Sequence, residues 1–143
     1  MTSNIGGRYL ANPELEEMEA REFAEKSVKE HFRPEFLNRL DNIIFFHLLT
    51  DDNLRDILGL LLKKEEKLLA GRDLTLRVSE GTKTWLLAQN DHPEWGARPL
   101  RRIIQKHIRE PMADFLLEED PAPGTIIKVT KRGKKLKFEQ GKK

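Results

Sequence analysis

A run of leucines and isoleucines spaced by three and four residues occupies the chain between residues 50 and 71. This spacing matches the 3.6-residue period of an α-helix, so it predicts one long helix with an apolar face that the fold must bury. Thr50 is typical of an N-cap, Asp51 and Asp52 suit the positive end of the helix dipole, and Gly71 marks the end. Capping therefore explains the two aspartates better than a magnesium site does. The apolar face comprises Leu54, Ile57, Leu58, Leu61, Leu62, Leu68 and Leu69.

A second apolar stripe predicts another long helix beginning near Arg98. Pro111 lacks an amide hydrogen and crowds the carbonyl of His107, so the helix is expected to kink or restart there. His107 falls within the stripe, where a partly buried histidine with satisfied contacts is favoured over a metal ligand. The apolar positions are Leu100, Ile103, Ile104, Ile108, Met112, Phe115 and Leu116.

Short alternating segments predict three strands that accompany these helices. Residues 74–78 alternate as one strand, and Ser79 is expected to cap a helix that carries Trp85. Residues 126–129 and 136–138 form a terminal hairpin around the turn at 131–134. From Thr50 onward, the pattern therefore predicts one compact α+β domain of about 90 residues.

The first 47 residues do not form a comparable pattern. A short strand is expected to end near Asn4, a helix to span Pro13–His31 with Asn12 as its cap, a helical turn to cover 35–39, and a buried strand to cover 42–46. The first strand has no evident partner. The chain is therefore expected to begin inside a larger sheet.

Composition narrows the class of protein. The chain has no cysteine, which excludes a disulfide framework and thiolate metal sites. No apolar run approaches a membrane span and no signal-peptide pattern is present, so a soluble, cytoplasmic protein is expected. From Lys128 to Lys143 there are eight Lys or Arg and one Glu. This basic tail is best explained as the exposed face of an edge hairpin, with nucleic-acid binding as a remote alternative.

Arg98 occupies an unfavourable position for a cation. It follows Gly96 and Ala97 at the first turn of a predicted helix, where the dipole already places partial positive charge. A bound anion would remove the conflict, because backbone N–H groups and a guanidinium together form a phosphate site. The alternative is an ordinary solvated surface arginine.

Three short motifs follow one another along the chain, and their order helps to identify a family. They are TSN at residues 2–4, FRPEFLNRLD at 32–41 and GARPLRR at 96–102. Together they resemble the C-terminal part of Clp-family AAA+ ATPases, most closely the ClpB type and its ClpC and ClpA relatives. The resemblance covers the whole chain. It implies that residues 1–47 are the tail of a large AAA+ subdomain and that residues 48–143 are the small C-terminal subdomain.

The resemblance also implies roles for individual residues. Asn4 matches the first sensor, Arg39 matches the arginine finger that acts on a neighbouring subunit, and Arg98, with Gly96 and Ala97, matches the second sensor. Taken alone, Asn4 is a turn residue and Arg39 forms a surface ion pair with Asp41. The family usually has tyrosine or phenylalanine before Gly-Ala-Arg. A larger aromatic at Trp95 can still pack beneath the loop, near the adenine.

The implied function is that of an ATP-dependent chaperone or disaggregase. Such a protein threads unfolded or aggregated proteins through a homo-hexameric ring, using ATP, ADP and Mg²⁺. This chain contains neither Walker motif, so we expect it to bind no nucleotide and to be inactive alone. An Hsp70-type co-chaperone is one expected partner. The alternative is the ATPase subunit of a Clp-type protease, with a Clp peptidase as partner.

Overall fold

The computed structural model describes residues 1–92 and 95–141, so residues 93–94 of the predicted loop and the last two lysines of the basic tail lie outside the description. The chain divides into two compact units, Met1–Leu48 and Leu49–Lys143.

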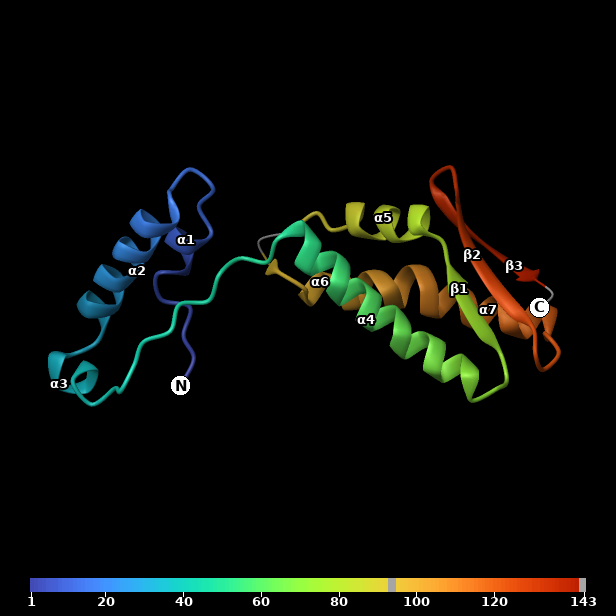
Figure 1. Cartoon of the computed structure of the whole chain (residues 1–143), viewed down its shortest axis with the longest axis horizontal. Coiled ribbons are helices and arrows are strands. Elements are labelled where there is room, and N and C mark those ends of the chain that lie inside the picture. The colour runs from blue at the N-terminus through green and yellow to red at the C-terminus, as the bar shows by residue number, and fades with distance from the viewer. Residues whose placement is uncertain (93–94, 142–143) are drawn as a thin grey trace. The chain divides into compact units, whose positions relative to one another are not determined.

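The second unit is built on a three-stranded mixed sheet with helices packed against it (Figure 1). The strand order is β1-β2-β3. The β1–β2 pair is parallel, with Leu76 opposite Ile127, and the β2–β3 pair is antiparallel, with Val129 opposite Phe138. The elements are α4 (Asp51–Ala70), β1 (Thr75–Val78), α5 (Glu80–Ala88), α6 (Arg98–Ile104), the π-helical turn η2 (Gln105–Arg109), α7 (Glu110–Glu119), β2 (Ile126–Arg132) and β3 (Lys135–Gly141).

Both apolar stripes predicted from the sequence meet in one core. Fully buried side chains come from α4, α5, α6, η2 and β2, so every layer of the unit contributes. This arrangement confirms the predicted α+β class. The most deeply buried hydrophobic residues are Leu58, Leu86, Leu100, Ile108, Ile127 and Val129.

Local capping explains where α4 and α5 begin. Thr50 Oγ1 accepts from the Asn53 amide at 3.2 Å, and Asn53 Oδ1 accepts from the Thr50 amide at 3.1 Å. Ser79 Oγ accepts from the Thr82 amide at 3.2 Å. The buried Thr82 hydroxyl also donates to the Val129 carbonyl at 3.2 Å, which fastens α5 to β2. Both predicted caps are confirmed.

The helical stretch from Arg98 to Glu119 changes its backbone hydrogen-bonding pattern near the middle. The turn η2 is π-helical, and α7 begins at Glu110 with Pro111 in its first turn. Pro111 has no amide hydrogen for the His107 carbonyl, so regular i to i+4 bonding is interrupted there. The predicted restart at Pro111 is confirmed. His107 is half-buried, as expected.

The terminal hairpin is tighter than expected. Strands β2 and β3 continue to Arg132 and from Lys135, which leaves a two-residue turn at 133–134. In the register, Lys128 faces Glu139 and Thr130 faces Lys137. Lys128, Arg132, Lys135 and Lys137 thus lie on the face opposite the core, as the edge-hairpin interpretation predicted. Lys131 is paired with Leu136 on the other face and is exposed.

The first unit contains three helices: α1 (Gly7–Leu10), α2 (Glu17–His31) and α3 (Pro34–Leu37). Gly6 has φ +75° and lies so close to α2 that an added Cβ would sit 2.8 Å from the Cα of Ala24. This contact holds the N-terminal loop against α2. The buried hydrophobic residues here are Ala20 and Ala24.

Three sequence expectations for this unit were wrong. Helix α2 begins at Glu17 rather than Pro13, because Asn12 Oδ1 instead accepts from the Glu14 amide at 3.0 Å in a turn. Residues 1–4 and 42–46 form no strand, and Phe46 is 78% exposed. A strand requires a hydrogen-bonded neighbour, and the described part of this unit supplies none.

In the part of the chain that the structure describes, no helix combines the length and apolar character needed to cross a bilayer.

Candidate functional site

Arg98 is the first residue of α6, as the sequence predicted. Gly96 adopts φ +66°, a left-handed conformation that turns the loop into the helix. Ala97 occupies the N-cap position, and its side chain makes no capping hydrogen bond. The helix N-terminus therefore keeps amide hydrogens that no side-chain cap satisfies.

All the charged residues of α6 are arginines. Arg101 and Arg102 follow in the same helix, and the first turn contains no acidic residue. Arg98 is exposed, and its guanidinium makes no hydrogen bond or ion pair with the described residues. An exposed guanidinium at an uncapped helix start suits an anion such as phosphate.

Trp95 lies just before this turn. It is 57% exposed, and its ring stacks on His92 with centroids 4.0 Å apart and an interplanar angle of 12°. Its amide donates to the His92 carbonyl at 3.0 Å. Trp95 thus packs against its own loop with a large part of the ring open to solvent, rather than being buried beneath it.

Arg39 lies two residues after the end of α3 in the first unit. Pro34 starts that helix, Phe32 packs on Phe36 with ring centroids 5.1 Å apart, and the Arg39 amide donates to the Phe36 carbonyl at 3.1 Å. The guanidinium is exposed and forms no ion pair with Asp41. The local ion pair considered as an alternative is therefore not formed.

Asn4 lies beside α2 in the same unit. Its carbonyl accepts from the Gly7 amide at 3.0 Å, and its side chain is exposed at the rim of a hollow of about 400 Å³. Ser27, Glu30 and His31 of α2 line the same hollow. Arg39 does not line it. The structure therefore describes Asn4 and Arg39 as separate features of the first unit, and Arg98 as a feature of the second.

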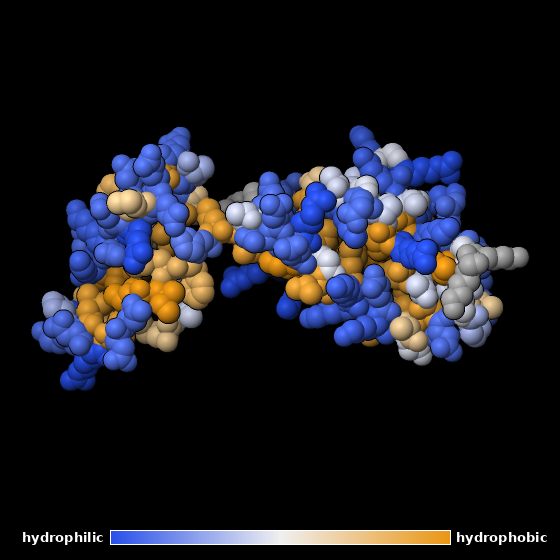
Figure 2. All heavy atoms as spheres, viewed as in Figure 1, coloured by the Kyte–Doolittle hydropathy of each residue, from blue (hydrophilic) through white to orange (hydrophobic). Residues whose placement is uncertain are grey.

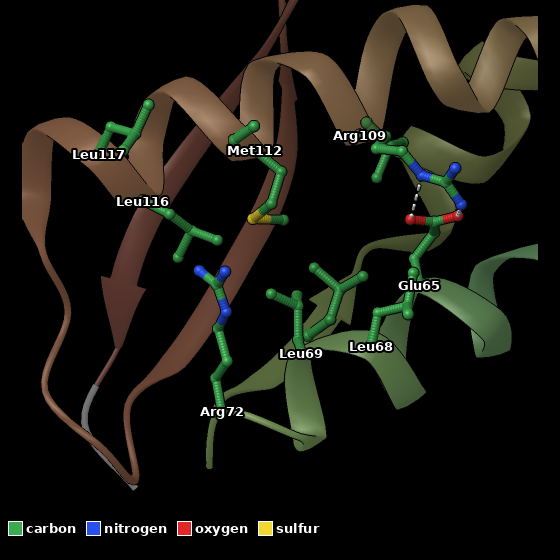
Figure 3. A pocket seen from close by; sticks show the side chains of 11 residues that line it. Glu65, Leu68, Leu69, Arg72, Arg109, Met112, Leu116 and Leu117 are labelled. Carbon is green, nitrogen blue, oxygen red and sulfur yellow. Dashed lines mark hydrogen bonds and ion pairs between the residues drawn. The ribbon is translucent and has the colours of Figure 1, made fainter.

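One contact near this helix was missed by sequence reasoning. Arg109 of η2 donates two hydrogen bonds to Glu65 of α4, at 3.0 Å from Nε and 2.5 Å from the terminal nitrogen (Figure 3). Glu65 is buried, and its hydrogen bonds and charge raise the pKa of Arg109 above its ordinary value. The pair joins α4 to the helical stretch that Arg98 begins. Its members are 44 residues apart, so no local spacing indicates it.

The described residues contain no group of three His, Asp or Glu side chains placed to hold a metal ion. Asp51 and Asp52 lie in the first turn of α4, where the dipole explains them.

Comparison with known proteins identifies the family. Residues 49–129 match the family described as the C-terminal, D2-small domain, of ClpB protein. The chain belongs to the ClpB family. It is 38% identical over 143 residues to the chaperone protein ClpB of Agrobacterium fabrum, with 97% of the chain aligned. The ClpB proteins of Rhizobium meliloti and Rickettsia bellii are 39% and 36% identical, with 99% and 97% of the chain aligned. In all three cases the chain spans 16% of the relative's length.

Proposed function

We propose that this chain is the C-terminal part of an ATP-driven ClpB chaperone that remodels or disaggregates proteins. The observation that carries the proposal is the ClpB match over residues 49–129, which includes Arg98 and the helix that it begins. The exposure of that guanidinium at an uncapped helix start supports a phosphate-contacting role. The activity itself belongs to a longer protein, localised in the cytoplasm.

Three residues carry the proposed nucleotide chemistry. Arg98 acts as the second sensor, with Gly96 and Ala97 shaping the turn. Arg39 acts as an arginine finger in trans, and Asn4 orients the attacking water as the first sensor. ATP or ADP with Mg²⁺ is held by Walker motifs outside these 143 residues, so the chain alone hydrolyses no ATP. A fixed guanidinium suits this task, because phosphoryl transfer depends on positioning and charge neutralisation.

Helix α6 would couple the state of the nucleotide to a movement of the small subdomain, because Arg98 is its first residue. A phosphate contact made by Arg98 only in the ATP state favours one placement of the helical stretch 98–119 over another. A ligand shifts such an equilibrium by its differential affinity for the two states. The Glu65–Arg109 pair makes α4 part of the same moving body.

The proposed partners follow from the family. They are five further copies of the same subunit in a homo-hexamer, unfolded or aggregated polypeptides as substrates, and an Hsp70-type co-chaperone. The relatives reported above are all named ClpB, which favours this branch over the subunit that serves a Clp peptidase.

A chimera tests the proposal. Residues 1–143 replace the aligned segment of Agrobacterium fabrum ClpB, and ATP hydrolysis and the reactivation of a heat-aggregated enzyme are measured. Arg98→Ala is expected to reduce ATP turnover at least tenfold, roughly 1.4 kcal/mol, and Arg98→Lys to restore part of it. Arg39→Ala is expected to reduce turnover by about 10³-fold, the lower end of the range for an arginine finger.

Arg77→Ala is the matched control, because Arg77 is an exposed arginine of β1. It is expected to leave both activities unchanged. Mixing Arg39→Ala subunits with Arg98→Ala subunits should restore part of the turnover, since a finger from an Arg98→Ala subunit can then complete the site of an Arg39→Ala neighbour. Full ATP turnover by the Arg98→Ala chimera would overturn the proposal.

A further inference from the structure

An apolar groove of about 480 Å³ lies between the C-terminal half of α4 and the stretch formed by η2 and α7 (Figure 3). Cavities of this size with apolar walls and a few polar groups are typical of binding sites. No role in nucleotide sensing accounts for it, since Arg98 does not line it. The floor is formed by Leu69, Leu76, Ile108, Met112 and Leu116, and Leu68 lies at the rim.

The groove extends along α4. A second hollow of about 230 Å³ shares Glu65 and Arg109 with the first and reaches Leu61 of α4 and Ile104 of α6. From Leu61 to Leu69, the combined surface follows about two turns of α4. We call these two hollows together the α4 groove.

The lining of the α4 groove carries an excess of positive charge. Its lining includes four cations, Lys64, Arg72, Arg101 and Arg109, and one carboxylate, Glu65. Glu65 is already paired with Arg109. The other three cations make no hydrogen bond or ion pair through their side chains with the described residues. Figure 3 shows the Arg72 side chain reaching toward Met112 and Leu116 across the floor.

Apolar side chains at the rim are open to solvent. Leu68 on α4 is 63% exposed, and Leu117 on α7 is 84% exposed. Exposed leucines beside an apolar groove are typical of a surface that binds another polypeptide. Met112 at the floor adds a flexible side chain that adapts to different partners.

We propose that the α4 groove binds an acidic amphipathic helix of another polypeptide. Leucine-type side chains spaced by three and four residues would fill the floor, and flanking carboxylates would meet Arg72 at one end and Lys64 and Arg101 at the other. The charge of the lining disfavours a basic helix. The lining contains no aromatic ring on which a nucleic-acid base could stack, so a polypeptide fits better than a single-stranded nucleic acid.

A labelled peptide tests this inference on the full 143-residue chain. The probe is a synthetic helix of about 18 residues, with leucines at i, i+3, i+4 and i+7 and glutamates beside them. Fluorescence anisotropy is expected to show saturable binding that weakens as salt rises from about 0.05 to about 0.3 M. Leu68→Asp and Arg72→Glu are each expected to weaken binding about tenfold or more.

The chain offers a matched control for each variant. Leu60→Asp changes a leucine of α4 that is 61% exposed and does not line the groove, and Arg77→Glu reverses an exposed arginine on β1. Both are expected to bind the peptide as the unmodified chain does. Circular dichroism verifies that all four variants fold.

Three results would overturn the proposal. The first concerns the anisotropy titration: either the unmodified chain shows no saturable binding, or Leu68→Asp and Arg72→Glu bind the peptide as tightly as the unmodified chain does. The second is equal affinity for a peptide in which lysines replace the glutamates, since that would show apolar adhesion alone. The third is self-association of the unmodified chain in sedimentation velocity that Leu68→Asp abolishes, since a second copy would then occupy the groove. None of these measurements depends on ATP turnover.

Discussion

Arg98 and Arg109 have the same side chain, and their surroundings give them different roles. Arg109 meets a buried carboxylate with two hydrogen bonds and holds two helices together. Arg98 lies at a helix start with no acidic neighbour in the first turn and remains open to solvent. A guanidinium with its donors unused can bind an anionic ligand, whereas a paired one is already committed to the fold.

The turn before Arg98 gives a first prediction at the residue scale. Gly96→Ala should destabilise the second unit by about 1 kcal/mol, because a non-glycine residue with left-handed backbone is strained. The added Cβ would lie 3.6 Å from Leu49 Cδ1, an ordinary contact, so conformation alone sets the cost. Tryptophan fluorescence during urea unfolding measures it, since both tryptophans lie in this unit.

Gly96→Asn is the matched comparison. Asparagine tolerates the left-handed region better than alanine does, so it should lose less stability. Equal losses for the two variants would show that side-chain packing, rather than backbone strain, determines the effect.

His107 gives a second prediction at this scale. Burial, and then the charge of Lys106, hold the pKa of His107 below its ordinary value, and its ring contacts Trp85 edge-on with centroids 5.0 Å apart. The unfolded chain therefore binds this proton more readily, so stability falls as pH decreases below the ordinary histidine pKa of 6.5. The loss continues until the pH passes the lowered pKa of the folded state.

Urea unfolding of the unmodified chain and of His107→Gln, between about pH 5 and pH 7.5, checks this expectation. The substitution should remove the part of the pH dependence that belongs to His107. Parallel pH curves for the two proteins would contradict it.

At the scale of elements, the sequence predicts helices of the second unit well and isolated strands poorly. The α4 stripe and the Thr50 and Ser79 caps act within one segment, so local spacing is sufficient to predict them. The apolar run at 42–46 was predicted as a buried strand, but it forms no strand and is largely exposed. Strand formation depends on a partner elsewhere in the chain, which an apolar run does not identify.

The contact between α4 and η2 gives the prediction at this scale. Arg109→Ala should cost about 1–3 kcal/mol, because it leaves the buried Glu65 carboxylate without its charged partner. The double variant Glu65→Met with Arg109→Met should lose less, since no charge is then left unpaired. Urea unfolding followed by tryptophan fluorescence provides the comparison. A double variant less stable than Arg109→Ala would contradict it.

At the scale of the whole molecule, the buried apolar residues are unevenly distributed. Apart from Ala20 and Ala24, the buried hydrophobic side chains among the described residues belong to the unit Leu49–Lys143. Figure 2 shows orange, hydrophobic residues among blue, hydrophilic ones on the visible face of this unit. Stability should therefore reside in the second unit.

Removing residues 1–48 tests that expectation. The shortened chain should keep its cooperative transition, with Tm shifted by less than about 4 °C, since a change of 1 kcal/mol moves a domain of this size by about that much. Differential scanning calorimetry measures the shift. A loss of cooperativity, or a much larger decrease in Tm, would show that the second unit depends on the first.

The sequence by itself determined the helices of the second unit, their Thr50 and Ser79 caps, the α+β class and the position of Arg98 at a helix start. These features depend on the order of residues within about 20 positions, where period, capping and dipole act directly. Only the tertiary structure decided the Glu65–Arg109 pair, the parallel pairing of β1 with β2 and the α4 groove. Each of these joins segments more than 30 residues apart, and packing of the whole core, rather than local spacing, brings such segments into contact.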